Sequence, residues 1–223
     1  MRKTTLALLV AAGTLAAAST ANADILWDQS VVDPGGPGFV DQAFPDVPDF
    51  NTYMVHDTSY ATNAVITDVT TYYTTGFGGW PSGAGSATLN VFTSLGAGDD
   101  PSAGTSVAVT YTNTGTGIEV HASGLNIAVS AGTTYWIGLT PELSFADFGQ
   151  EFHSQAAVAM GAATQARNPG GGFGVGTDWF DAGVVFGGVT GWDGAILVEG
   201  VIPAPGAFAL LGMAGLVGTR RRR

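Results

Sequence analysis

Hydrophobic and polar positions alternate with a period of two along much of the middle of the chain. In segment 64–73, AVITDVTTYY, the alternation places Val65, Thr67, Val69, Thr71 and Tyr73 on one face. The same alternation recurs at 87–93, 106–112, 118–120, 125–129, 133–140 and 194–202. Because successive side chains of a strand point to opposite faces, this pattern predicts half-buried β-strands.

Turn signals rich in glycine separate these segments at the spacing typical of an all-β sandwich or barrel. They lie at 96–101, 115–117 and 131–132, and longer irregular stretches are expected at 33–50, 76–85 and 169–176. Only the interval 155–165 has a composition that would allow a short helix. We therefore predict an all-β fold, a jelly-roll-like antiparallel β-sandwich, for residues 24–202.

The first 23 residues have the pattern of a secretory signal peptide. A basic start, Met1-Arg2-Lys3, precedes an apolar run at 6–18 and the small residues Ala21 and Ala23. Signal peptidase would cut before Asp24. The alternative is an uncleaved membrane anchor, which the short apolar run and the cleavage site disfavour.

The last 21 residues form a second exceptional segment. Pro203, Ala204 and Pro205 end the last strand, because proline lacks a donor N–H and holds φ near about −65°. An uncharged run at 206–218 follows, and the chain then carries Arg220, Arg221, Arg222 and Arg223. The arginines would stay in the cytoplasm and place residues 24–202 across the membrane. A run of 13 residues spans only about 20 Å of a core of about 30 Å, which favours transient retention over permanent anchoring.

This order of prolines, apolar run and arginine cluster resembles the PEP-CTERM sorting signal of bacterial exported proteins. The family motif is Pro-Glu-Pro, and here Ala204 stands at the acidic position. The resemblance implies handling by an exosortase-like membrane transpeptidase that recognises the tail at 203–223.

Three short motifs in the middle of the chain carry a second resemblance. They are WDQ at 27–29, TYWIGLTP at 134–141 and WDGAILVEG at 192–200. Together they resemble the "choice-of-anchor" type of bacterial extracellular β domain, which implies an exported location and a β fold.

Charge and cysteine content narrow the range of partners. Residues 24–202 carry all 18 acidic residues of the chain, and Arg167 is the only lysine or arginine among them. Such a surface cannot neutralise phosphates, so nucleic-acid binding is excluded and anionic lipid is disfavoured. The chain has no cysteine, so the exported domain must be stable without disulfide bonds.

A structural calcium ion is one candidate ligand of this acidic domain. Asp99, Asp100, Asp178, Asp181 and Asp193 lie beside glycines or in turns, where carboxylate and carbonyl oxygens can gather. No D-x-D-x-D-G loop is present, so the alternative is that these residues form turns and keep the domain soluble. No other cofactor is expected.

Two Glu-x-His pairs, Glu119/His121 and Glu151/His153, form another candidate metal site. Residues two apart on a strand share a face, so neighbouring strands could bring both pairs to one transition metal. The alternative is that all four are solvated on outward faces.

Three tryptophans lie in loop-like contexts, where a flat ring could stack on a sugar. They are Trp80, Trp179 and Trp192, and Phe173 and Phe180 both lie near Trp179 in the sequence. The alternative is that these rings cover the open ends of the core, because large aromatic side chains are mostly buried.

Nothing in the sequence indicates catalysis. There is no cysteine and no G-x-S-x-G motif, and the glycine-rich run at 172–176 lacks the lysine of a phosphate-binding loop. We therefore expect a non-enzymatic exported protein of the cell surface or extracellular matrix, transiently anchored in the inner membrane. The alternative is a carbohydrate-binding module that uses the loop tryptophans to bind exopolysaccharide.

Overall fold

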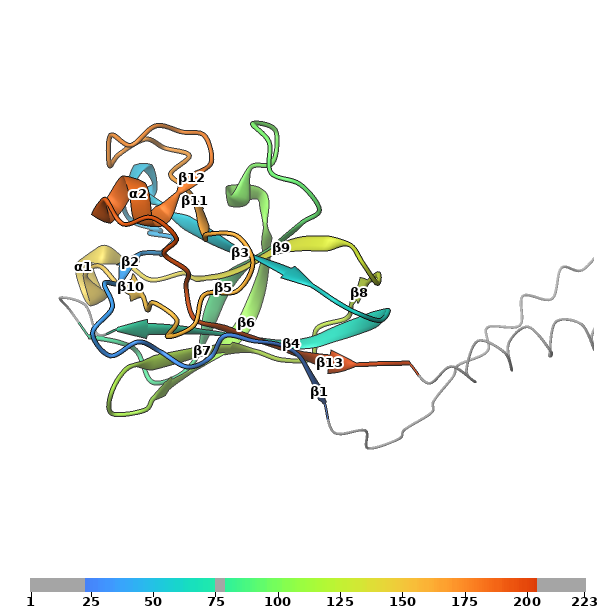
Figure 1. The fold of residues 1–223 in the computed structure, drawn as a ribbon. Helices are drawn as coiled ribbons and strands as arrows, with labels where there is room; N and C mark the ends of the chain where they lie inside the picture. The colour runs from blue at the N-terminus through green and yellow to red at the C-terminus, as the bar shows by residue number, and fades with distance from the viewer. Residues whose placement is uncertain (1–22, 75–78, 204–223) are drawn as a thin grey trace, which may run out of the picture.

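Antiparallel strands dominate the described part of the chain, residues 23–74 and 79–203 of a computed structural model (Figure 1). The longer strands are β1 (Asp24–Asp28), β3 (Tyr53–Ser59), β4 (Ala64–Thr74), β5 (Gly83–Phe92), β6 (Thr105–Asn113), β7 (Ile118–Ala122), β9 (Thr134–Pro141) and β13 (Ile196–Val201). The shorter ones are β2 (Phe39–Val40), β8 (Ile127–Val129), β10 (Phe152–His153), β11 (Gln165–Arg167) and β12 (Phe180–Asp181). Helical structure in these residues is limited to η1 (Pro48–Phe50), η2 (Pro101–Ala103), α1 (Phe145–Phe148) and α2 (Ala182–Gly187). The all-β prediction is confirmed.

The strands form one curled sheet. Hydrogen-bonded neighbours among the described residues follow the order β1-β13-β4-β7-β6-β5-β9-β3-β11-β12, with β8 and β10 also paired to β4, and β2 paired to β10. The curl brings β4 opposite β9, where the hydroxyl of Thr71 donates to the carbonyl oxygen of Leu139 at 3.1 Å and the hydroxyl oxygen of Tyr73 lies 3.1 Å from the same carbonyl oxygen. The sheet therefore encloses its own core.

Strand β4 contains a bulge that reverses its faces. Its register against β13 shifts at the Glu199–Gly200 step, which leaves Thr67 as an extra residue. The inward face consequently passes through Ile66 before the bulge and through Val69 after it. The expected face is confirmed at Val69, Thr71 and Tyr73, and is wrong at Val65 and Thr67.

Two clusters of buried side chains fill the molecule. The larger one lies inside the curl and includes Ile66, Val69, Val120, Ile137, Leu139, Ile196 and Val198. The smaller one, at the end that carries β12 and α2, consists of Phe39, Met54, Ala166, Ala182 and Trp192. Between the two clusters lies a group of buried polar residues, described below.

Most predicted strands are confirmed, because β4 to β9 and β13 coincide with the alternating segments. The short helix allowed at 155–165 is wrong. Backbone bridges from Gln155 to Gly194 and from Ala156 to Val32 hold the start of that segment, the chain then bends at 157–158 and 161–162, and β11 begins at Gln165. Strand β3 went unpredicted because most of its side chains are buried, so no polar alternation marks it.

The predicted signal peptide and sorting tail lie almost wholly outside the described residues. Within the described ranges, the structure has no helix with the length and apolar character needed to span a membrane.

We predict that Gly138→Ala destabilises the fold by about 1–3 kcal/mol, since overpacking in a dense core costs that much. A Cβ atom at Gly138 in β9 would lie 2.0 Å from the carbonyl oxygen of Met54 in β3. Denaturant unfolding measures the loss. Gly98→Ala is the matched control, because its Cβ would meet nothing within 4 Å, and equal losses in both variants would contradict the prediction.

Candidate functional site: a buried histidine–aspartate network

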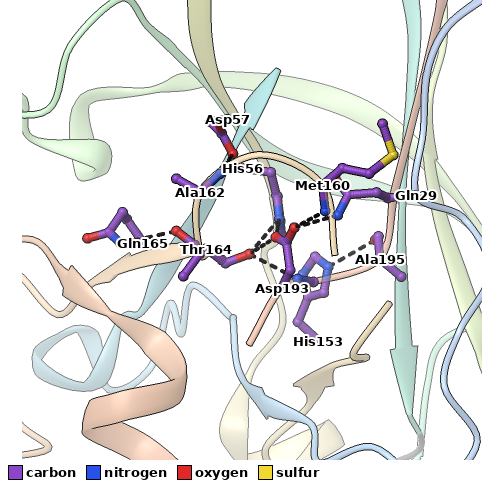
Figure 2. A network of polar contacts seen from close by, with 12 residues as sticks. Gln29, His56, Asp57, His153, Met160, Ala162, Thr164, Gln165, Asp193 and Ala195 are labelled. Carbon is purple, nitrogen blue, oxygen red and sulfur yellow. Dashed lines mark hydrogen bonds and ion pairs between the residues drawn. The ribbon is translucent and has the colours of Figure 1, made fainter. Parts of the chain in front are cut away.

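Two histidines lie side by side in the interior. His56 in β3 is 1% exposed and His153 in β10 is 0% exposed, and their ring centroids are 4.8 Å apart. Gly194 makes room for both rings, because a Cβ there would lie 2.5 Å from Cε1 of His56 and 2.8 Å from Nε2 of His153. Figure 2 shows the two rings with the polar groups around them.

A buried carboxylate, Asp41, anchors one side of this network. It follows β2 and is fully buried. Its Oδ1 accepts the N–H of Met54 at 3.1 Å and the hydroxyl of Thr140 at 2.6 Å, and its Oδ2 accepts the hydroxyl of Tyr73 at 2.7 Å and bonds Nδ1 of His153 at 3.0 Å. These donors replace the hydrogen bonds from water that a carboxylate loses when it is buried.

His153 is held between two acceptors. Its Nδ1 faces the carboxylate of Asp41, and its Nε2 lies 3.0 Å from the carbonyl oxygen of Ala195. A carbonyl oxygen cannot donate, so Nε2 carries a hydrogen, and Nδ1 shares a second hydrogen with the carboxylate. This pattern fits an imidazolium–carboxylate ion pair.

His56 is bound differently. The hydroxyl of Thr164 donates to Oδ1 of Asp193 at 2.7 Å and accepts the N–H of Gly194 at 2.9 Å. The hydroxyl hydrogen of Thr164 and one of its lone pairs are therefore used. The remaining lone pair accepts the hydrogen on Nδ1 of His56, 2.9 Å from the hydroxyl oxygen. The other ring nitrogen, Nε2, is buried without a hydrogen-bond partner among the described residues.

These surroundings decide which of the two side chains, His56 and Asp193, carries a charge. Burial lowers the pKa of His56, and the nearby His153 adds to the effect, so the ring is neutral. Burial would raise the pKa of Asp193, but the neighbouring His56 ring, with Nδ1 3.8 Å from Oδ1, and hydrogen bonds from Thr164 and Gln29 outweigh it, and the net shift is downward. The network therefore holds a neutral histidine beside an ionised carboxylate.

A hydroxyl, an imidazole and a carboxylate in contact suggest a nucleophile, but the geometry argues against that role. The hydroxyl of Thr164 donates to Asp193 rather than to His56, so the imidazole is not placed to take its proton. All three side chains are buried. The network joins β3, β10 and the segment before β13, and its direct effect is to hold these elements together.

The motifs singled out in the sequence converge on this network. Gln29 of the WDQ motif donates from Nε2 to Oδ2 of Asp193 in the WDG motif, and Trp27 donates to Oε1 of Gln29 at 2.7 Å. Thr140 of TYWIGLTP bonds to Asp41. Sequence reasoning missed Asp41, His56 and Thr164. The sequence signal that could have found them is a single polar residue beside or within a short apolar run, as Asp41 follows Phe39 and Val40, because such a residue is carried into the core with its neighbours.

The three candidate tryptophans lie in different surroundings. Trp192 is 0% exposed and its Nε1 donates to the carbonyl of Pro37, so its ring offers no face to a sugar. Trp80 is half-buried against the core, 5.1 Å from Tyr73 between ring centroids. Trp179 is also half-buried, with the guanidinium of Arg167 5.9 Å from its ring centroid.

The candidate calcium ligands have local partners. Asp99 accepts the N–H of Gly96, while Asp100 caps η2 and Asp181 caps α2. Asp193 belongs to the buried network, and Asp178 is exposed. Across residues 23–74 and 79–203, no three His, Cys, Asp or Glu residues are grouped so as to hold a metal ion.

The two Glu-x-His pairs are not brought to one site. His121 on β7 bonds to the hydroxyl of Thr70 and lies 3.5 Å from Asp68 at the surface. His153 is fully buried against Asp41. Although β7 and β10 both pair with β4, the two histidines face different surroundings.

Fold and network together define a class, an all-β protein with a curled antiparallel sheet and a buried polar centre. Compared with known protein families, with curated proteins and with solved structures, the chain matches none of them. Its function must therefore be argued from its own residues.

We predict that Asp41→Asn lowers the free energy of unfolding by about 3–5 kcal/mol, the cost of breaking a buried ion pair. The amide nitrogen would face hydrogen-bond donors, and His153 would lose its counter-charge. Asp147→Asn, at an exposed position, should change stability by less than about 0.5 kcal/mol. Denaturant unfolding of both variants measures the difference, and a small loss in Asp41→Asn would show that the network is dispensable.

Stability should also fall as the pH drops below about 6.5, the pKa of an unperturbed histidine. His56 stays neutral in the folded protein while the unfolded chain takes up a proton, so acid favours unfolding by up to about 1.4 kcal/mol per pH unit. In His56→Asn, whose amide can still donate to Thr164, the slope between about pH 6.5 and 5 should flatten. An unchanged slope in His56→Asn would refute the assignment.

Proposed function

We propose that this chain is a non-enzymatic exported protein of the cell surface or extracellular matrix, and that its tail is processed by an exosortase-like enzyme. In this proposal the β domain is a sandwich of jelly-roll type, delivered by a signal peptide. Residues 203–223 hold it at the inner membrane until they are removed.

The observation that supports the proposal most directly concerns where the folded unit begins and ends. Strand β1 begins at Asp24, directly after the expected cleavage site, and β13 ends at Val201, two residues before Pro203. The two strands pair, with Asp24 opposite Gly200, so the chain enters and leaves the domain at one edge of the sheet (Figure 1). Removing either end segment would leave the described ladders intact.

The non-enzymatic part of the proposal rests on burial. The histidines and aspartates that come closest to a catalytic arrangement, those of the polar network, are buried and out of reach of a substrate in solution. The alternative, a carbohydrate-binding module, now depends on Trp80 and Trp179, because the buried ring of Trp192 has no free face.

We predict that the exported form begins at Asp24 and lacks the arginines at 220–223. Intact-mass measurement of the cell-surface fraction tests both ends at once. A variant truncated after Ile202 should appear in the soluble exported fraction and not with the membranes, because it lacks the segment proposed to retain it. A full-length chain that remains soluble in the cytosol with Met1 present would refute the proposal.

A further inference from the structure

An apolar recess opens beside η1 and α1, on a part of the surface that the proposed function does not use. Its volume is about 250 Å³, which is small for a ligand pocket and suits one compact group. Its lining consists of Phe44, Val47, Phe50, Phe145, Gln150 and Phe173. Gln150 is the one polar side chain in this lining, so the walls are almost wholly aromatic and aliphatic.

The phenylalanine rings of the recess meet edge to face. Phe44, which is buried, lies 6.1 Å from Phe145, and Phe50 lies 5.2 Å from Phe173, both between ring centroids. Phe145 is 51% exposed and Phe50 is 40% exposed, so the rings present their surfaces to solvent. Four aromatic rings around one small space form the arrangement known as an aromatic cage.

Hydrogen bonds fix the elements that carry these rings. Both carboxylate oxygens of Asp46 accept N–H groups at the start of α1, from Phe145 and Ala146 at 2.9 Å each. Asn168, which is buried, donates to the carbonyl of Asp49 at 2.9 Å and accepts the N–H of Phe173 at 3.1 Å. The cage is therefore organised before any ligand arrives, which lowers the entropic cost of binding.

The charges around the cage have one sign. Asp46, Asp49 and Asp147 lie next to or within the elements that line it, and all three are exposed. Arg167 is the only lysine or arginine between residues 24 and 202, and its guanidinium is already bound to the carbonyls of Ala97 and Asp99. A cation near the cage is therefore attracted, and an anion is repelled.

We propose that this recess binds a small organic cation of the trimethylammonium class. The ring faces attract a positive charge, and the nearby carboxylates strengthen the attraction. In this lining only the side chain of Gln150 offers an acceptor, so a primary ammonium group, with three N–H groups, would lose most of its water without replacement. A quaternary ammonium group has no N–H to satisfy, so it fits this wall better than ammonium, lysine or a sugar does.

Titration of the purified full chain with choline, followed by calorimetry or by NMR of the phenylalanine rings, tests the proposal. Three probes are compared: choline, methylammonium, and the neutral isostere of choline in which a tert-butyl group replaces the trimethylammonium group. Choline should bind at least about fivefold more tightly than either of the others. Equal binding of choline and the neutral isostere would show an apolar pocket without cation selectivity and would overturn the proposal, as would no binding of choline at all.

Substitutions locate the site. Phe145→Leu should weaken choline binding about fivefold or more, whereas Phe92→Leu, at a half-buried ring that packs on Trp179 instead, should leave it unchanged. Asp147→Asn should weaken choline binding about twofold at low salt and leave the neutral isostere unaffected. Binding that survives Phe145→Leu at full strength would place the cation elsewhere and refute the assignment. The readout does not depend on export or tail processing, so the two proposals fail separately.

Discussion

The buried carboxylate of Asp41 is the constraint on which the rest of the interior depends. A charge removed from water must be met by donors, and here those donors come from β3, β4, β9 and β10. The side chain therefore fixes the distance between opposite walls of the curled sheet. Two hydrophobic clusters flank it, and neither of them alone would specify how the walls are aligned.

The second buried carboxylate, Asp193, links the last part of the chain to the rest of the interior, as Asp41 links the opposite walls of the sheet. Its oxygens accept from Gln29 near the first strand, from the N–H of Met160 and from Thr164. Segments that are far apart in the sequence thus meet at one point in the interior (Figure 2). Because each group is bound by several others, the removal of any one would leave a buried polar atom unpaired.

Sequence periodicity predicted the strands that have one wet face and one dry face, since those strands alternate. Periodicity did not predict strands that lack one exposed and one buried face. Most of strand β3 is buried on both sides, and its buried polar members, His56 and Thr58, bond inside the fold rather than to water. The bulge at Thr67 breaks the period without leaving a mark in composition. The sequence could not reveal the polar network, because its members become neighbours only when the sheet curls. It left Trp192 open between a loop and a core position, because the turn residues that flank it are compatible with both, and the structure places the ring in the core.

The position of β13 has a consequence for the order of events during synthesis. This strand is inserted between β1 and β4, so both of its neighbours are made earlier and must wait for it. Asp193 and Ala195, which complete the polar centre, are made just before it. A nascent chain therefore cannot join β1 to the rest of the sheet, or complete the polar centre, until nearly all of the domain has left the ribosome.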